Sequence, residues 1–547
     1  MKITRKTLSL VLAAALTLSV FTGCAKSAPS STPTAPSGSD VKPLKLTMLV
    51  PNNQNPYIKF DDREDYPVWQ ELKKLFEAKG LEIEFEVVAP DQYPTTVQTR
   101  IASGNDLPDI INLSSFDDAS AMALANKGVI QPINKFVENC GDGTFTNFIE
   151  KDYPFMKQLT TAPDGNIYWY TSVQVQTYQG KPATTNRVIN IRKDWLEKLK
   201  LPVPTTTDDF IAVMKAFQDN DMNGNGVKDE IVTVDTSGDF FMTGIAQWFG
   251  LSNYLTGVDV KNGKIVSPWY QDGIKDYLKF MQRLVAEGLF DTDLIGATYE
   301  QTSQRMAENK VGATFDYCMQ TWLEPSINAE GAEFLPIYDV NAGDYTPHLI
   351  VEPSFFSWHK WAISKDCENP EAVAALLDVL YSPEYETLTA WGIEGKSYEV
   401  VDGRRQLMEG VGNAFWEQNA KDHNTPGSGL WSGCVFPTVS LYTMESQFTS
   451  RPEHKNEYQK ATAYYENVYP DAKYCYTAIA TDEQNTRKGE IATDLSTYSS
   501  ELVTDFVLGR ASFDKWDEYM SQLKTLGLDE LMAIEQSQLD KFNELSK

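Results

Sequence analysis

Leu81-Glu-Ile-Glu-Phe-Glu-Val87 alternates apolar and acidic residues, which predicts a β-strand with one buried and one hydrated face. Strands are also predicted at 44–50 before it and at 109–113 after it. Apolar residues at helical spacing separate the strands: Trp69, Leu72, Leu75 and Phe76, then Tyr93, Val97 and Ile101. This order of elements predicts an α/β fold with parallel strand pairing and right-handed crossovers.

In such a sheet, ligands bind beyond the carboxyl ends of the strands. Segments 51–55, 89–91 and 114–118 follow the three strands, so we expect a ligand site among them.

A second series of elements begins near residue 167. It contains a predicted strand at 187–191, a helix opened by a capping box of Thr206 and Asp209, and a strongly amphipathic helix from 274 to 285. The C-terminal part of the chain is predicted to be helical.

The N-terminus is typical of an export signal. Basic residues precede an apolar run, 8–21, that is too short to span a bilayer as a helix. Thr22 and Gly23 before Cys24 resemble a bacterial lipobox, in which residues 1–23 are removed and Cys24 is diacylated, as with palmitate. The alternative is an ordinary cleaved signal followed by a free cysteine. Residues 24–43, rich in Ser, Pro, Thr and Ala, would then be a flexible tether that holds an extracytoplasmic protein to the cell membrane.

Composition excludes some functions. A formal net charge of −28 argues against binding nucleic acid or anionic lipid headgroups, since both require basic patches. Hydrophobic residues make up 42% of the chain, which is typical of a globular protein. The cysteines beyond Cys24 are scattered without CxxC spacing, so neither a disulfide framework nor a zinc site is indicated.

One loop has the pattern of a calcium site. In Asp221-Met-Asn-Gly-Asn-Gly-Val-Lys-Asp-Glu230, oxygen-bearing side chains occupy positions 1, 3, 5 and 9, and glycine occupies position 6. Position 7 contributes a backbone carbonyl, so its side chain is unconstrained. The glutamate falls at position 10 rather than 12, which departs from an EF-hand. The alternative is a polar Asn-Gly turn without metal. The expected ligands are Asp221, Asn223, Asn225, the Val227 carbonyl, Asp229 and Glu230, and one unpaired loop suggests a structural calcium.

Catalytic signatures are absent: there is no GxSxG, HExxH, P-loop or GxGxxG motif. Two carboxylates could still meet in a cleft as a glycosidase pair, which spacing does not exclude. Aromatic residues are abundant, and rings can stack on the apolar faces of sugars, although core packing is the alternative for each one. Trp322, Trp391 and Tyr170 are the better candidates, because they follow strands or lie beside polar residues and glycine.

Four segments together resemble the family 1 extracellular solute-binding proteins, the lipoprotein receptors of carbohydrate ABC importers. They are Ser103–Ile111 (SGNDLPDII), Ile191–Leu199 (IRKDWLEKL) running on to Pro204-Thr-Thr, Trp361–Lys365 (WAISK) with Asn369–Ala372, and Trp391–Tyr398 (WGIEGKSY) with Val401–Gly403. The calcium loop and large size further resemble the alginate-oligosaccharide-binding branch, in which the loop is structural.

The resemblance implies an α/β fold of two lobes, of the type II periplasmic-binding-protein kind. Each lobe would be a mainly parallel sheet flanked by helices, with a helical C-terminal extension. Lobe 1 would comprise 44–165 and 355–400, and lobe 2 would comprise 166–354 and 401–547, including the loop at 221–230.

The resemblance also implies a function and a site. The chain would be a monomeric, non-enzymatic receptor that captures an oligosaccharide between its lobes and delivers it to the permease subunits. The implied ligand-binding residues are Ser114, Asp117, Trp391 and Glu394 from lobe 1, Trp169 and Tyr170 near the crossing, and Asp316 and Trp322 from lobe 2. The alternatives are a surface glycoside hydrolase or lyase, and a lipoprotein that binds a peptide or signal. The net charge disfavours a polyanionic sugar.

Overall fold

The structure is a computed structural model. It describes residues 43–52, 59–178, 181–182, 186–232, 243–251, 257–295, 299–317, 331–337, 340–347, 350–351, 359–401, 403–408, 436–437, 439–443 and 478–545. In this part of the chain, no helix combines the length and the apolar character needed to cross a bilayer.

The first sheet has the strand order β2-β1-β3-β15-β4, with β5 paired to β15. Its parallel half consists of β1 (Leu44–Pro51), β2 (Leu81–Val88) and β3 (Ile110–Asn112), as the sequence predicts. The strand β15 (Lys360–Ser364) is antiparallel to β3, to β4 (Ile130–Gln131) and to β5 (Trp169–Thr171). The sheet is therefore mixed.

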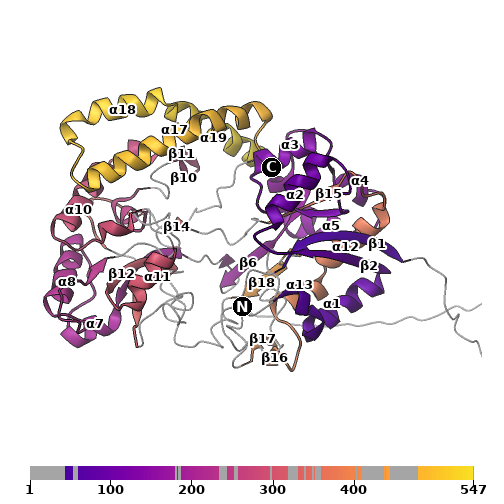
Figure 1. Ribbon diagram of the computed structural model, residues 1–547, viewed down its shortest axis with the longest axis horizontal. Helices are drawn as coiled ribbons and strands as arrows, with labels where there is room; N and C mark the ends of the chain where they lie inside the picture. Colours follow the sequence, from indigo (N-terminus) through magenta and orange to yellow (C-terminus); the bar gives the residue numbers. More distant parts are fainter. Residues whose placement is uncertain are drawn as a thin grey trace, which may run out of the picture. The chain divides into compact units, whose positions relative to one another are not determined.

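Alternation along β1 assigns its two faces. Leu46, Met48 and Val50 point into one core with α1 (Pro67–Ala78), α12 (Pro370–Leu380) and α13 (Pro383–Ala390). Leu49 points into a second core with α2 (Tyr93–Ser103) and α3 (Asp118–Asn126). Helices thus cover both faces of the sheet (Figure 1). Short helices complete this part: η1 (Phe60–Asp65), α4 (Asn134–Val137), α5 (Thr144–Asn147), η2 (Phe148–Asp152) and α6 (Pro154–Thr160).

The second sheet has the order β13-β8-β12-β9, with β14 also paired to β8. Here β8 (Asn186–Arg192) is antiparallel to β12 (Val311–Tyr317), β13 (Phe334–Ile337) and β14 (Ile350–Val351), and only β9 (Ile231–Val232) pairs in parallel with β12. The α/β fold is confirmed, and both sheets are mixed rather than mainly parallel.

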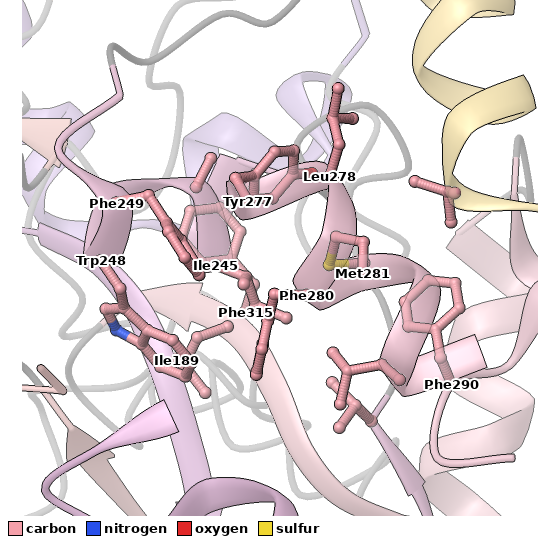
Figure 2. Packing of buried hydrophobic residues seen from close by; sticks show 14 of the residues in the cluster. Ile189, Ile245, Trp248, Phe249, Tyr277, Leu278, Phe280, Met281, Phe290 and Phe315 are labelled. Carbon is pink, nitrogen blue, oxygen red and sulfur yellow. The ribbon is translucent and has the colours of Figure 1, made fainter. Parts of the chain in front are cut away.

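A large apolar core covers the second sheet. Phe315 and Ile189 of the strands pack against α10 (Ile274–Ala286), which buries Tyr277, Leu278 and Met281 (Figure 2). The helix α8 (Thr207–Asp219) joins the same core, and its predicted capping box is confirmed, because Thr206 and Asp209 exchange hydrogen bonds of 3.0 Å. The other helices of this part are α7 (Lys193–Leu199), α9 (Thr243–Ala246), η3 (Gln247–Phe249), η4 (Pro268–Tyr270), η5 (Thr292–Leu294) and α11 (Tyr299–Ala307).

The C-terminal helices are α17 (Asp482–Val507), α18 (Trp516–Thr525, preceded by η8, Phe513–Lys515) and α19 (Leu528–Leu545). The helix α17 packs on α10, where Gln282 Nε2 donates to the Phe506 carbonyl at 2.6 Å. Three small sets of strands complete the fold: β6 (Val173–Tyr178) with β18 (Val439–Thr443) and β7 (Lys181–Pro182), β10 (Asp259–Lys261) with β11 (Lys264–Val266), and β16 (Tyr398–Val401) with β17 (Arg404–Leu407). The predicted helical extension is confirmed, whereas the lobe boundaries stay a prediction.

We expect Thr206→Ala to lower the free energy of unfolding by about 1 kcal/mol, because it removes the hydroxyl that accepts the Asp209 N–H at the start of α8. Urea denaturation measures this change. Thr207→Ala, one position into the helix, is the matched control and should change stability by less than about 0.5 kcal/mol. Equal effects of the two substitutions would show that the cap does not stabilise the helix.

Candidate functional site

The carboxyl ends of β1 and β3 lie side by side, since Met48 and Leu49 pair with Ile110 and Ile111. The buried hydroxyl of Tyr93 lies at this edge. It accepts the Asn112 N–H at 3.1 Å and is within hydrogen-bond distance of the Leu49 and Asn112 carbonyls, at 3.2 and 3.0 Å. Burial raises the pKa of Tyr93 well above its ordinary value, so the hydroxyl remains a neutral donor. This hydroxyl therefore ties together the two strand ends from which the loops leave.

Beyond β3, the loop 114–118 bends into α3. The Ser114 N–H donates to Asn112 Oδ1 at 2.8 Å, and the Phe116 N–H donates to the Leu113 carbonyl at 2.9 Å. Asp117 is the N-cap of α3 and accepts the Ser120 N–H at 2.7 Å. The hydrogen bonds from Ser120 lower the pKa of Asp117, so an ionised and exposed acceptor stands at this edge.

Lys360, the first residue of β15, holds this loop in place, a role that no sequence pattern indicates. Its N–H donates to Ser114 Oγ at 3.3 Å, and its Nζ donates to the Phe116 carbonyl at 3.0 Å and pairs with Asp118 at 3.1 Å. The lysine side chain is only 12% exposed. Its place follows from the antiparallel insertion of β15 beside β3, and no local pattern encodes that pairing.

Three aromatic residues predicted to contact the ligand are buried in this structure. Trp169 and Tyr170 lie in β5 and are 3% and 2% exposed, and the Tyr170 ring stacks on Trp361 with centroids 5.8 Å apart. Trp391 follows α13, is 4% exposed and packs edge-on against Tyr398. All three rings have packing roles here, and ligand contact by them stays a prediction.

The other predicted ligand residues lie in different places. Glu394 is exposed in the turn before β16, where it forms an isolated bridge with Tyr398. Asp316 lies on β12 opposite Val188 of β8. Trp322 lies outside the described residues, as do Cys24 and the segment that contains it. The structure thus brings together Ser114 and Asp117, both on the loop after β3.

The loop 221–230 is wrapped by its own hydrogen bonds. The carboxylate of Asp221 accepts the Asn225 and Gly226 N–H groups at 3.1 and 2.8 Å, and the Asn225 amide donates to both Asp229 oxygens at 3.0 and 3.1 Å. Glycine is required at 226, where φ is 82°. The chain therefore curls around the side-chain oxygens that the sequence predicts as ligands.

Glu230 tests whether a cation suits this loop. It is fully buried, Oε1 accepts the Asn223 N–H at 3.2 Å, and Oε2 has no hydrogen-bond partner among the described residues. A buried carboxylate oxygen without a partner is costly, and a bound cation would relieve that cost. The donors are all oxygens, which suits calcium. In the described residues, however, no three His, Cys, Asp or Glu side chains converge as a metal site, and Lys310 Nζ pairs with Asp229 at 3.2 Å.

Comparison with known proteins identifies the class. Residues 61–387 match the family model described as bacterial extracellular solute-binding protein. The chain is 26% identical over 487 residues, 86% of each protein, to the fructooligosaccharide ABC transporter substrate-binding protein FusA of Streptococcus pneumoniae serotype 4. It is 24% identical over 398 residues to the lipoprotein LipO of Bacillus subtilis strain 168, covering 71% of this chain and 74% of LipO.

Solved structures share the fold. The alginate-binding protein AlgQ2 without calcium ion superposes with a TM-score of 0.66 at 22% identity, covering 91% of this chain and 98% of AlgQ2. An EF-hand mutant of S. pneumoniae FusA in complex with fructo-nystose gives a TM-score of 0.70 at 23% identity, covering 91% of this chain and 99% of FusA. These matches confirm the periplasmic-binding-protein-like fold.

His359, next to Lys360, should make stability depend on pH. Burial, with a smaller contribution from Lys360, lowers the pKa of His359 to about 4. The unfolded chain therefore takes up this proton near its ordinary value of about 6.5, while the folded chain does not. Stability should fall by about 3 kcal/mol as the pH drops from about 7.5 to 4.

We expect His359→Gln to flatten this part of the profile of unfolding free energy against pH, measured by urea denaturation. Parallel profiles for the parent and the variant would contradict the assignment.

Proposed function

The chain belongs to the bacterial extracellular solute-binding protein family, and from this premise we propose that it captures an oligosaccharide for an ABC importer. Proteins of this family are non-catalytic components of transport systems, so the chain is not an enzyme. The observation that carries the proposal is the match to a fructooligosaccharide-binding protein over 86% of both chains. The solved structures are 22% and 23% identical in sequence to this chain, so they show that the fold is shared but do not indicate which sugar this chain binds.

The proposed site is the loop 114–118 at the carboxyl edge of the first sheet. Ser114 and Asp117 supply a hydroxyl and an ionised carboxylate, groups that hydrogen-bond sugar hydroxyls, and Lys360 donates to the Ser114 hydroxyl and to the Phe116 carbonyl between them. We propose that Glu394 and Asp316 approach the same ligand from other segments, with Trp322 of the undescribed part. Contact by Trp169, Tyr170 or Trp391 would require these rings to become more exposed than they are here.

Capture would involve the two lobes proposed from the sequence, 44–165 with 355–400 and 166–354 with 401–547. The lobes would close on the sugar, and the sugar would favour closure only by its greater affinity for the closed state. Because the net charge is −28 and Lys360 is already paired with Asp118, we propose a neutral oligosaccharide.

The receptor would work outside the cytoplasm, as a monomer tethered by lipid on Cys24 and the linker up to residue 43. The similarity to a lipoprotein over 71% of the chain supports this location. The sugar would pass intact to the permease subunits of the importer.

We also propose that the loop 221–230 binds one structural calcium through Asp221, Asn223, Asn225, the Val227 carbonyl, Asp229 and Glu230. The donor set is all oxygen, and the buried Oε2 of Glu230 has no hydrogen-bond partner within the described ranges, which supports this proposal. Calcium would neutralise the carboxylates and brace the end of α8, at which the loop begins.

Isothermal titration of the mature protein with kestose, nystose and an alginate oligosaccharide tests the function. We expect binding of a neutral sugar, and chromatography after long incubation should recover it unchanged. Ser114→Ala should weaken binding about tenfold, since a hydroxyl that bonds the ligand is lost, whereas the exposed neighbour Ser115→Ala should not. Cleavage of the sugar would contradict the proposal, and so would a peptide ligand in place of any sugar.

Calcium should raise the melting temperature of the protein, and a chelator should lower it, because a ligand that binds only the folded state stabilises it by about 2.7 kcal/mol at a hundredfold excess over Kd. Asp221→Asn should abolish the response. Asp219→Asn, just before the loop, is the matched control and should retain it, since Asp219 is 69% exposed and pairs with Lys228. If neither calcium nor a chelator changes the melting temperature of the parent protein, the calcium site is refuted.

A further inference from the structure

A cavity of about 490 Å³ lies between η1, α1 and β2, on the first sheet. Its walls include Arg63, Trp69, Phe76, Ile83 and Phe85. It adjoins the amino-terminal half of β2 and Pro43, so it lies at the end of the sheet opposite to the loop 114–118. Its size is within the range of about 300–1,000 Å³ that small-molecule sites occupy. The cavity is thus separate from the proposed sugar site.

Arg63 and Lys73 are cations of the cavity lining, and Arg63 lies against its aromatic rings. Its guanidinium carbon lies 4.6 Å from the ring centroid of Phe60, 5.4 Å from that of Phe85 and 5.9 Å from that of Trp69. Nη1 donates to the Phe60 carbonyl at 3.1 Å, while the buried Nε has no acceptor in the described part of the chain. Across the part of the chain that the structure describes, Arg63 forms no ion pair with a carboxylate. Its charge is therefore held among aromatic rings without an acidic partner.

Glu64, which follows Arg63 in the sequence and also lines the cavity, is bonded to other groups. Its carboxylate accepts the Trp69 indole N–H at 2.9 Å, the Gln70 amide at 3.0 Å and Lys73 Nζ at 3.0 Å. These hydrogen bonds, of which the one from Trp69 has the largest effect, lower the pKa of Glu64 to about 2. The carboxylate therefore remains ionised and accepts from Trp69 and Lys73 at neutral pH. Lys73 is neutralised by this contact, whereas Arg63 has no ion-pair partner among the described residues.

We propose that this cavity binds a small organic monocarboxylate, with its carboxylate on the Arg63 guanidinium and its apolar body against Ile83 and Phe85, the half-buried apolar residues of the lining. A guanidinium matches a carboxylate in a two-pronged, charge-assisted contact, and the Phe85 ring supplies a flat apolar wall. Glu77 and Glu82 also line the cavity, so a second negative charge on the ligand would be repelled. The ligand class therefore excludes phosphates and polyanionic sugars.

Calorimetric titration of the mature protein with sodium phenylacetate, at constant ionic strength, tests this site. We expect binding, and we expect phenylacetamide, which has the same ring without the charge, to bind at least tenfold more weakly. This comparison uses the unaltered chain, so it does not depend on any variant folding. The absence of phenylacetate binding, or equal affinity for the amide, would overturn the proposal.

Substitutions locate the bound probe. Arg63→Gln should weaken phenylacetate binding at least tenfold. Arg63→Lys should have an intermediate effect, because lysine keeps the positive charge but cannot make the bidentate contact of a guanidinium. Lys73→Gln, the matched control, should change the affinity less than threefold. Unchanged affinity in a folded Arg63→Gln variant would overturn the assignment. A saturating oligosaccharide should leave phenylacetate binding unaltered, so failure of the sugar proposal would not affect this result, whereas direct competition would refute a separate site.

Discussion

The hydroxyl of Tyr93 at the carboxyl ends of β1 and β3 is the contact on which the candidate site depends. Parallel pairing places Leu49 beside Ile111, and the single buried hydroxyl then serves peptide groups of both strands. This contact therefore positions the loop 114–118, which follows β3. Without it, buried peptide groups of Leu49 and Asn112 would lose a partner at the point where the chain turns toward α3.

Much of the first sheet could be predicted because its signals are local. Alternation locates β2 at 81–88 against a predicted 81–87, and the Thr206–Asp209 box locates the start of α8. The antiparallel insertion of β15 could not be predicted, since this strand pairs with β3 and β5, which lie far away in sequence. Lys360 was missed for the same reason. A pattern of apolar residues reveals a strand but not its neighbours.

In the candidate site too, local sequence patterns predict some residues and not others. Ser114 and Asp117 could be located because they follow a predicted strand, and their position needs only the parallel rule. The rings of Trp169, Tyr170 and Trp391 could not be sorted, because composition does not distinguish a ring in a core from one in a ligand site. The loop 221–230 has the spacing of a calcium site, while Glu230 Oε2 and the nearby Lys310 become visible only in three dimensions.

The central proposal is that the chain captures an intact sugar at the carboxyl edge of the first sheet. A crystal structure of the chain with a bound neutral oligosaccharide tests this most directly. We expect unbroken glycosidic linkages, with sugar hydroxyls within hydrogen-bond distance of Ser114 and Asp117. A sugar seated away from this loop, or one found as cleaved products, would contradict it.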